Sequence, residues 1–384
     1  MRVAVPTEIV PGEKRVALAP EVIPQLLKLG HTVAIQSGAG TRAGFTDDAY
    51  AAAGATIEAD ARSTYSGADM LLKVQRPAIG PSGNELDLLS SGSVLIGLLQ
   101  PSGDPSIFGS LARLGVTACS MELVPRTSRA QMMDALSSQS TVAGYKAVLL
   151  AANALQKFFP MLMTAAGTVR PARVLVIGAG VAGLQAIATA RRIGAVVEAF
   201  DTRPVVKEQV QSLGAKFIEL NFGSQNAEDA GGYATELAEE HIRREKELIH
   251  EHARNADVVI TTALVPGRRA PLLVTAETVA AMKPGSVIVD LAGEQGGNCE
   301  LTEPGETVER HGVTIIAPLH IASDLAYHAS QMYAKNVAAL VTLMTTNGNL
   351  NLDMNDDIIS AVCVTANGQV RNAAIASRLE EAAQ

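Results

Sequence analysis

Three glycines stand at fixed spacing directly after an apolar run, in a stretch that reads VLVIGAGVAG from residue 174 to residue 183. Gly178 would allow a tight turn, Gly180 would let the backbone approach a pyrophosphate, and Gly183 would let a helix pack closely on the strand. The N–H groups at the start of that helix would then bind the phosphates. The spacing predicts a dinucleotide site, and the alternative is a glycine turn in an ordinary βαβ unit.

A carboxylate follows at the end of the next apolar run. Asp201 comes 18 residues after Gly183, where a side chain can accept hydrogen bonds from ribose hydroxyls and repel a 2′-phosphate. This favours NAD(H) over NADP(H). Arg203 is close enough to neutralise such a phosphate, or it is a solvated loop charge, and the sequence leaves both interpretations open.

The polar stretch 124–140 reads VPRTSRAQMMDALSSQS and interrupts the apolar pattern around it. Such polar density beside a core is typical of an exposed functional loop. The alternative is a hydrophilic linker between domains. A second polar stretch, 220–233, contains two adjacent glycines before Tyr233, and is either a lid over bound nucleotide or a surface insertion without a role.

Several other kinds of chemistry are not indicated. The seven histidines have no HExxH spacing, the three cysteines form no CxxC pair, and no GxSxG is present. We therefore expect no metal site and no hydrolase. A dehydrogenase that oxidises an alcohol or an amine needs a general acid or base, whereas hydride exchange between two nicotinamides needs none. The presence or absence of a catalytic base therefore distinguishes these two classes of enzyme.

The length and net charge of the chain further limit the classes of protein that fit this sequence. A chain of 384 residues exceeds one ordinary core, so we expect two domains. The net charge of -8 argues against a nucleic-acid-binding surface. Widely spaced cysteines fit a reducing cytosol. The N-terminus is unlike a signal peptide, and no apolar run reaches the ~20 residues that cross a bilayer, so membrane association would have to come through partners.

Short apolar runs alternate with helical patterns in both halves of the chain, which predicts parallel sheets covered on both faces. The expected fold is α/β, with two Rossmann-like doubly wound parallel-sheet domains, a cleft between them, and a C-terminal β-hairpin around Asn367-Gly368. The first domain would comprise 1–136 and 325–384, and the NAD(H)-binding domain 137–324. We expect strands at 3–5, 32–36, 70–73, 94–97, 116–119, 216–219, 257–261, 286–291 and 313–316, helices at 20–29, 107–114, 142–163, 207–213 and 325–343, and hairpin strands at 358–364 and 369–370.

Further segments resemble a known family along essentially the whole chain. Four of them are similar to the NAD(H)-binding first component of proton-translocating NAD(P) transhydrogenase: VPTE at 5–8, PGEKRVALAP at 11–20, MELVPRTSRAQ at 121–131 and DLAGEQGGNC at 290–299. Alanine dehydrogenase is the related alternative, and shares the position of Arg15, Lys73 and the glycine motif. It is expected to carry a catalytic histidine in the region that reads LIGLLQPS here, Lys-Glu-Pro in its lysine motif, and neither the polar loop nor the C-terminal hairpin.

The resemblance implies roles for particular residues. Gln131, Arg126, Asp134 and Ser137 would lie at the nicotinamide end as the catalytic group, with Gln131 reaching toward the nucleotide on a partner subunit. The remaining cofactor-binding residues would be Thr127, Ser128, Met132 and Met133 beside them, Gly178, Gly180, Val181 and Gly183 at the pyrophosphate, Asp201, Thr202 and Arg203 at the adenosine end, Gly232 and Tyr233 in a mobile loop, and Leu264 lining the pocket. Thr127, Met132 and the segment 320–324 depart from the family pattern.

The resemblance also implies a reaction and partners. The chain would be a cytoplasmic, homodimeric subunit that passes hydride from NADH to NADP⁺ with Re/Si specificity. A separate subunit would hold NADP(H), and membrane-embedded subunits would couple the transfer to proton translocation. The chain would then be peripheral to the inner membrane. The alternatives are a self-sufficient amino-acid dehydrogenase and a nucleotide-sensing module without catalysis.

Overall fold

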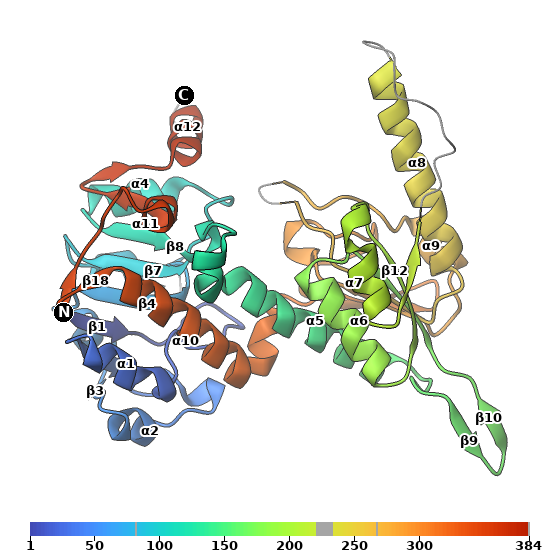
Figure 1. Cartoon of the computed structure of the whole chain (residues 1–384), viewed down its shortest axis with the longest axis horizontal. Helices are drawn as coiled ribbons and strands as arrows, with labels where there is room; N and C mark the ends of the chain where they lie inside the picture. Colours follow the sequence, from blue (N-terminus) through green and yellow to red (C-terminus); the bar gives the residue numbers. More distant parts are fainter. Residues whose placement is uncertain (81–82, 220–232, 266–267, 383–384) are drawn as a thin grey trace. The chain divides into compact units, whose positions relative to one another are not determined.

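The computed structural model describes residues 1–80, 83–219, 233–265 and 268–382 (Figure 1). Between 233 and 241 it describes the helical backbone, and of the side chains there only that of Glu240. The chain divides into two compact units. Unit 1 comprises Met1–Gln139 and Ala322–Gln384, and unit 2 comprises Ser140–Ile321.

Unit 1 is built on an eight-stranded sheet in the order β21-β20-β8-β7-β4-β1-β2-β3. The six strands from β8 to β3 are parallel, and β20 and β21 complete the β8 edge in antiparallel pairing. The strands are β1 (Arg2–Val5), β2 (Thr32–Gln36), β3 (Thr56–Glu58), β4 (Met70–Gln75), β7 (Val94–Leu98), β8 (Thr117–Ser120), β20 (Cys363–Ala366) and β21 (Gln369–Val370).

Both faces of this sheet are buried under helices. Successive residues of a strand contribute to opposite faces. Met70 and Leu72 of β4 face a core with α1, α10 and α11, whereas Leu71 faces a second core with α3 and α4. The helices are η1 (Pro20–Val22), α1 (Ile23–Lys28), η2 (Thr41–Ala43), α2 (Asp47–Ala52), α3 (Ala61–Tyr65), η3 (Glu85–Leu88), α4 (Ser106–Arg113), η4 (Met121–Leu123), η5 (Ser128–Met133), α10 (Ala326–Leu343), α11 (Asp357–Val362) and α12 (Ala373–Ala382). Two short ribbons add β5 (Ile79–Gly80) with β6 (Gly83–Asn84) and β18 (Thr345–Thr346) with β19 (Asn349–Leu350).

Unit 2 is built on a seven-stranded sheet in the order β13-β12-β11-β14-β15-β17-β16, in which only β16 is antiparallel. Helices α5, α6 and α7 cover one face, and α8 and α9 cover the other. Its strands are β11 (Arg173–Ile177), β12 (Val196–Phe200), β13 (Lys216–Ile218), β14 (Val258–Thr261), β15 (Val287–Asp290), β16 (Thr307–Arg310) and β17 (Val313–Ile316). The helices are α5 (Ala135–Ala154), which begins in unit 1, α6 (Val181–Arg192), η6 (Pro204–Val206), α7 (Lys207–Ser212), α8 (Tyr233–Ala253), α9 (Ala276–Ala281), η7 (Gly293–Gln295) and η8 (Ile321–Leu325), which ends in unit 1.

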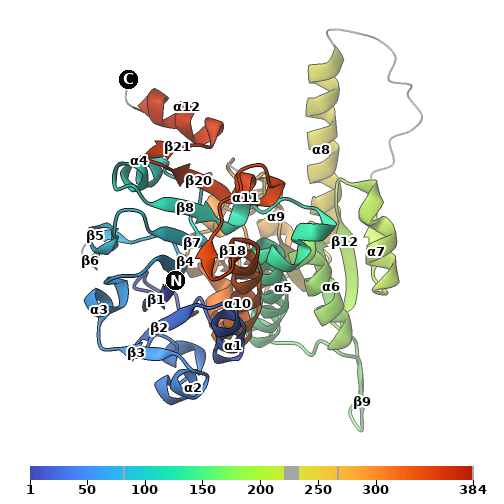
Figure 2. The same ribbon diagram turned by 60° about the vertical axis from the view of Figure 1, so that its left-hand side comes forward.

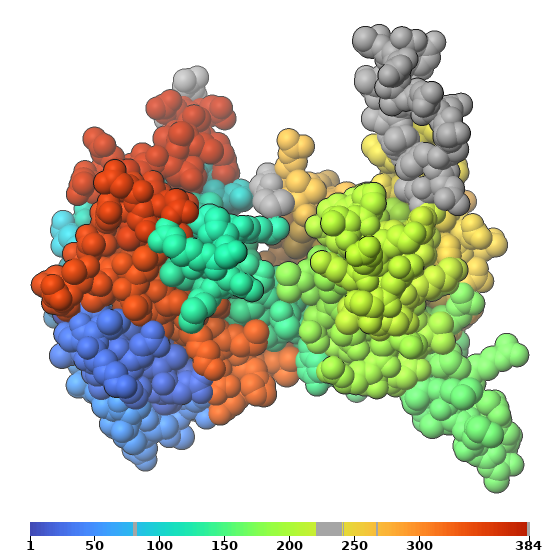
Figure 3. All heavy atoms as spheres, viewed as in Figure 1, coloured from blue at the N-terminus to red at the C-terminus, as the bar shows by residue number. Residues whose placement is uncertain are grey.

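A two-stranded ribbon of β9 (Leu162–Thr164) and β10 (Gly167–Val169) stands apart from both large sheets. It projects from the body of unit 2 as a narrow arm (Figure 3). Met163 in this arm is 81% exposed. The arm therefore presents apolar side chains to its surroundings.

The predicted α/β class, with two doubly wound sheets and a C-terminal hairpin, is confirmed. The strands β20 and β21 pair around Asn367 and Gly368, whose φ angles of 51° and 75° suit a tight hairpin turn. The helices expected at 20–29, 107–114, 207–213 and 325–343 are present within a residue or two of their predicted bounds.

Three local predictions were wrong. The helix expected at 142–163 is α5, which begins at Ala135 because Asp134 caps it, and the chain after Ala154 turns into the β9–β10 ribbon. The stretch 124–140, expected as a loop, contains η5 and the start of α5. Residues 358–362 of the predicted strand 358–364 belong to helix α11, because the carboxylate of Asp356 caps a helical turn there. A strand at 56–58 was not predicted.

The sequence indicated no membrane-spanning segment, no metal site and no cysteine pair. None of its helices is long and apolar enough to cross a membrane, and no cluster of metal-ligating side chains was found there. The three cysteines are free and buried.

Candidate functional site

The glycine motif forms a sharp turn between β11 and α6. Gly178 has a φ of 95°, in the left-handed region that side chains rarely adopt, and its N–H donates to the carbonyl of Phe200 at 2.8 Å. A Cβ on Gly178 would come within 2.6 Å of Thr262 Oγ1. The turn therefore requires glycine for conformation and for space.

Gly183 and Gly180 differ in what surrounds them. A Cβ on Gly183 would lie 1.8 Å from the carbonyl oxygen of Gly178, so the first turn of α6 can pack on the loop only with glycine there. A Cβ on Gly180 would meet no described atom within 4 Å, and the φ of Gly180 is an ordinary -75°. The fold itself gives no steric reason for glycine at 180, whereas a pyrophosphate lying against the backbone would give one.

The start of α6 is also crowded from its other side by α5. A Cβ on Gly144 of α5 would lie 2.0 Å from the carbonyl oxygen of Ala182, so the two helices touch backbone to backbone. No role was predicted for Gly144 from the sequence. A glycine inside a long apolar helix was the available signal for this close packing.

Asp201 lies at the carboxyl end of β12 and is tied to the glycine turn. Its Oδ2 accepts a hydrogen bond from the N–H of Ala179 at 2.7 Å, and its side chain is only 6% exposed. Burial alone would raise the pKa of Asp201, but hydrogen bonds from Arg203 and Ala179 outweigh it and hold the pKa below its usual range. The carboxylate is therefore charged at neutral pH, as ribose recognition requires.

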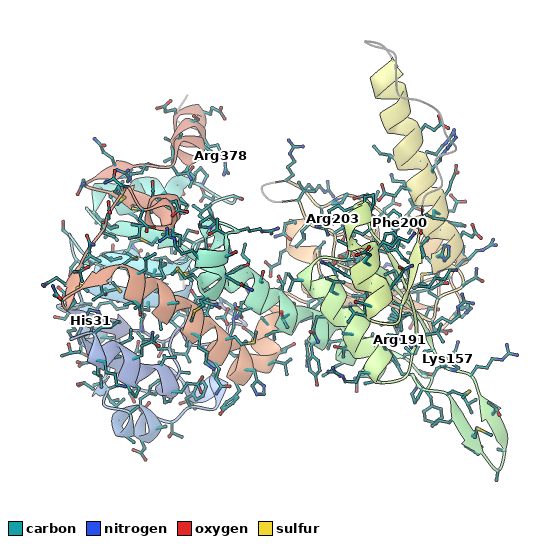
Figure 4. The ribbon with its side chains drawn as sticks, in the orientation of Figure 1. His31, Lys157, Arg191, Phe200, Arg203 and Arg378 are labelled. Atoms are coloured by element: carbon teal, nitrogen blue, oxygen red, sulfur yellow. The ribbon has the colours of Figure 1, made fainter. Side chains whose placement is uncertain are left out.

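Arg203 is the partner of Asp201 in the structure. Its Nε and Nη2 lie 3.0 and 2.9 Å from the two carboxylate oxygens, and its own N–H donates to Asp201 Oδ1 at 2.8 Å. Figure 4 labels Arg203 together with Phe200, the last residue of β12. Arg203 is thus neither a free phosphate ligand nor an unpaired loop charge. Thr202 lies between the two paired residues and is exposed.

The neighbouring strand ends are held by residues that sequence reasoning did not assign. Asn298 is fully buried, accepts from the N–H of Ala263 at 3.0 Å and donates to its carbonyl at 2.9 Å. Asp290 in turn accepts from the N–H of Asn298 at 2.8 Å. These bonds fix the chain just before Leu264, which is 48% exposed. The family-like stretch 290–299 was the available signal.

Two further residues predicted for this site are Gly232 and Tyr233. Gly232 lies outside the described residues, and Tyr233 is described only as the first residue of α8. The lid expected at 220–233 likewise lies almost wholly outside the described residues.

The polar segment of unit 1 contains both exposed and anchored residues. Met132 is 75% exposed, while Ala130 and Met133 lie in the core of unit 1. Asp134 accepts from the N–H and hydroxyl of Ser137 at 2.9 and 2.6 Å, which caps α5. The other predicted nicotinamide residues, which are Arg126, Thr127, Ser128 and Gln131, are exposed.

The two cations whose positions are expected to be shared with alanine dehydrogenase, Lys73 and Arg15, are buried in ion pairs. Lys73 Nζ lies 2.7 Å from Glu85 Oε1 and 3.2 Å from Glu8 Oε2. Arg15 Nη2 lies 2.6 Å from Glu13 Oε2, and a second bond at 2.8 Å makes this pair bidentate. Each cation is therefore already neutralised by carboxylates of the same unit.

The region where a dehydrogenase histidine would be expected contains an ordinary strand end. Leu99 is buried and Gln100 is exposed, and their N–H groups donate to the carboxylate of Glu122 at 3.1 and 2.8 Å. Burial raises the pKa of Glu122, although hydrogen bonds from Ser120 and from backbone N–H groups oppose the shift. The carboxylate of Glu122 thus closes this strand end.

Comparison with known proteins places these features in a family. The model of the alanine dehydrogenase/PNT C-terminal domain matches residues 147–373, and that of the N-terminal domain matches residues 4–143. The chain belongs to the alanine dehydrogenase/PNT family, an NAD-binding oxidoreductase family that includes transhydrogenases.

Individual relatives fall in both branches of the family. The chain is 48% identical to the first part of NAD(P) transhydrogenase subunit alpha from Rhodospirillum rubrum over 379 residues, which cover 98% of this chain and 99% of that protein. A solved transhydrogenase structure from Sinorhizobium meliloti matches with a TM-score of 0.87 and 44% identity, covering 96% of this chain and 100% of that one. An L-alanine dehydrogenase structure matches with a TM-score of 0.82 and 28% identity, covering 99% of both chains.

Proposed function

We propose that this chain is the NAD(H)-binding subunit of a proton-translocating NAD(P) transhydrogenase, which passes hydride from NADH directly to NADP⁺ on a partner subunit. The observation that carries the proposal is the similarity to a transhydrogenase alpha subunit over 98% of this chain and 99% of that protein, at 48% identity. The identity to the solved alanine dehydrogenase is lower, at 28%.

The residues of unit 2 fit a dinucleotide. The open space at Gly180 leaves room for a pyrophosphate, and the first N–H groups of α6 have no acceptor within the helix. In this proposal, the charged carboxylate of Asp201 accepts hydrogen bonds from ribose hydroxyls and repels a 2′-phosphate. These features support NAD(H), with NADP(H) left to the partner.

The polar segment of unit 1 supplies the nicotinamide end in this proposal. Bound NADH supplies a hydride from its nicotinamide ring and needs no proton acceptor for that transfer. Gln131, Arg126, Asp134 and Ser137 would orient the ring and exclude water. Thr127, Ser128, Met132 and Met133 would complete this end, and Gln131 would contact the nucleotide of the partner. The rest of the cofactor would be bound by Gly178, Val181, Gly183, Thr202, Arg203, Gly232, Tyr233 and Leu264.

The subunit partners follow from the same proposal. Proton translocation and the NADP(H) site would reside on other, membrane-embedded subunits, and this chain would be peripheral to the inner membrane on its cytoplasmic side. A homodimer is supported by the β9–β10 arm, because a lone two-stranded ribbon is marginally stable and this one exposes apolar Met163. Sedimentation of the pure chain tests the dimer, and a monomer at micromolar concentration would contradict it.

Alanine dehydrogenase activity is the second candidate, since a solved enzyme of that class shares the fold over 99% of the chain. Such an enzyme must bind a carboxylate substrate and move a proton. Arg15 and Lys73 are, however, already paired with carboxylates, and Leu99-Gln100 offers no imidazole.

Reconstitution separates the two candidates. The chain is mixed with the NADP(H)-binding partner, and reduction of an NAD analogue by NADPH is followed optically. The proposal expects reduction that requires both proteins, and none when the pure chain is given NAD and alanine. Turnover of alanine by the chain alone would establish the dehydrogenase instead.

A further inference from the structure

Segment η5 is anchored by a carboxylate from the C-terminal region of the same unit. Arg129 Nη1 donates to Asp356 Oδ2 at 2.6 Å, and Arg129 Nη2 donates to Asp356 Oδ1 at 3.0 Å. The neighbouring carboxylate of Asp357 contacts the same guanidinium. Two parallel bonds between a guanidinium and a carboxylate fix the orientation of both groups.

Asp356 also holds the first turn of α11. Its Oδ1 accepts from the N–H groups of Ile358 and Ile359 at 2.9 and 3.1 Å. One carboxylate therefore links the helix to Arg129. The hydrogen bond from Arg129 lowers the pKa of Asp356 to about 2, so the link is charged at physiological pH.

Helix α11 is itself firmly placed. Ile358, Ile359 and Val362 are buried in the core of unit 1. Cys363 then begins β20 and pairs opposite Cys119 of β8. The two strands lie side by side in Figure 2. Strand β8 leads through η4 to the polar segment, and α11 packs against η4. Residues 356–366 therefore pack against β8 and η4, and contact the polar stretch 124–140 at Arg129.

A second contact fixes the far end of η5. Asn336 of α10 donates from Nδ2 to the carbonyl of Met132 at 2.8 Å, and its Oδ1 accepts from the hydroxyl of Ser138 at 2.7 Å. Ala130 and Met133 are buried. Gln131 is thus an exposed residue between two positions that are held in place.

We propose that Asp356 is a positioning residue for hydride transfer, which acts through Arg129 to hold η5 in the conformation that presents Gln131. The inference rests on the proposed function. Asp356 touches no reacting atom in this account, because its carboxylate is occupied by the guanidinium and by the α11 backbone. Loss of the link would let Gln131 and Arg126 move, and a displacement of about 1 Å can cost on the order of 100-fold in rate.

The test is the variant Asp356→Asn in the full chain, reconstituted with the NADP(H)-binding partner. Asparagine is as good a helix cap as aspartate, so α11 is retained while the ionic link is lost. We expect single-turnover hydride transfer to fall about ten-fold or more, with the Kd for NADH within about two-fold of wild type. Arg129→Gln should show the same loss, and the double variant should be no slower than either single one.

The matched control is Asp60→Asn. Asp60 caps the short helix α3 of the same unit by accepting from the N–H of Ser63 at 2.8 Å. This control should transfer hydride at the wild-type rate. A loss in Asp356→Asn that matches the loss in Asp60→Asn, or that follows a parallel loss of NADH affinity, would overturn the positioning role.

Hydrogen exchange of the amides in η5 gives a readout that does not depend on transfer. Exchange at 128–133 should rise in Asp356→Asn and stay unchanged in Asp60→Asn. Unchanged exchange together with wild-type transfer in Asp356→Asn overturns the inference. If the wild-type chain transfers no hydride, the proposed function fails; raised exchange at 128–133 would then show only that Asp356 holds η5, and unchanged exchange would refute that link as well.

Discussion

The carboxylate of Asp201 accepts a hydrogen bond from the N–H of Ala179 at 2.7 Å, so the end of β12 holds the glycine turn that follows β11. One side chain therefore has two tasks. Its hydrogen bond supports the glycine turn, and under the proposed function its charge would recognise the ribose of a bound dinucleotide. Substitutions that remove only the charge, or the whole carboxylate, can separate these tasks.

Asp201→Asn keeps an oxygen that can accept from Ala179 but removes the charge. We expect NADH to bind about 10- to 100-fold more weakly, since hydrogen bonds to charged groups contribute about 1.5–3 kcal/mol. NADPH should bind relatively better, because its 2′-phosphate is no longer repelled. Titration calorimetry with both nucleotides measures this. An unchanged preference for NADH would show that Asp201 does not select the cofactor.

Asp201→Ala additionally removes the bond to Ala179, and so should lose about 1 kcal/mol of unfolding free energy relative to Asp201→Asn.

Gly180→Ala and Gly183→Ala should fail in different ways. A Cβ at 180 meets open space in the fold, whereas a Cβ at 183 would lie 1.8 Å from a backbone oxygen. We expect Gly180→Ala to fold with a normal Tm and to lose NADH affinity by ten-fold or more, roughly 1.4 kcal/mol. Gly183→Ala should be unstable. Full NADH affinity in Gly180→Ala would contradict the close approach of a pyrophosphate.

Gly144→Ala tests the contact between α5 and α6. The added Cβ would lie 2.0 Å from the carbonyl oxygen of Ala182, so the helices must separate, at a cost of about 1–3 kcal/mol. The control is Gly109→Ala in α4, where the nearest atoms lie 3.6 Å away and alanine should stabilise the helix by up to about 1 kcal/mol. Urea unfolding distinguishes them, and equal stabilities would refute this contact.

The buried pair of Glu13 with Arg15 predicts a dependence of stability on acid. Burial would raise the pKa of Glu13, but bonds from Arg15, Ser323 and Gln75 lower it to about 2. The unfolded value is about 4.3, so this contribution is fully present above about pH 4.3 and is lost as the pH falls toward 2. Glu13→Gln should flatten the decline of unfolding free energy in this window. An identical decline in the variant would exclude Glu13 as its source.

The sequence predicted those features that depend on short-range pattern. The glycine turn, a carboxylate directly after the second strand and the Asn367-Gly368 hairpin each follow from residue types at neighbouring positions, and all three are present. The boundaries of α5 could not be read in this way, because the cap at Asp134 lies inside a polar stretch that resembles a loop.

Contacts between particular side chains were the other kind of feature that the sequence did not reveal. The pairing of Arg203 with Asp201 was missed because side-chain direction decides it. The bond from Arg129 to Asp356 joins residues more than two hundred positions apart. Asn298 is a similar case, since its role depends on β14 and β15 lying side by side.

In the proposed reaction, hydride passes directly between two nicotinamides without a proton-handling side chain. The test is to reconstitute the chain with its NADP(H)-binding partner and to supply NADH that carries deuterium as the transferred hydrogen on C4. The mass of the NADPH formed is then measured by mass spectrometry. Direct transfer should leave deuterium in essentially all of the NADPH and release none to water. Deuterium lost to solvent, or oxidation of alanine by the chain alone, would contradict it.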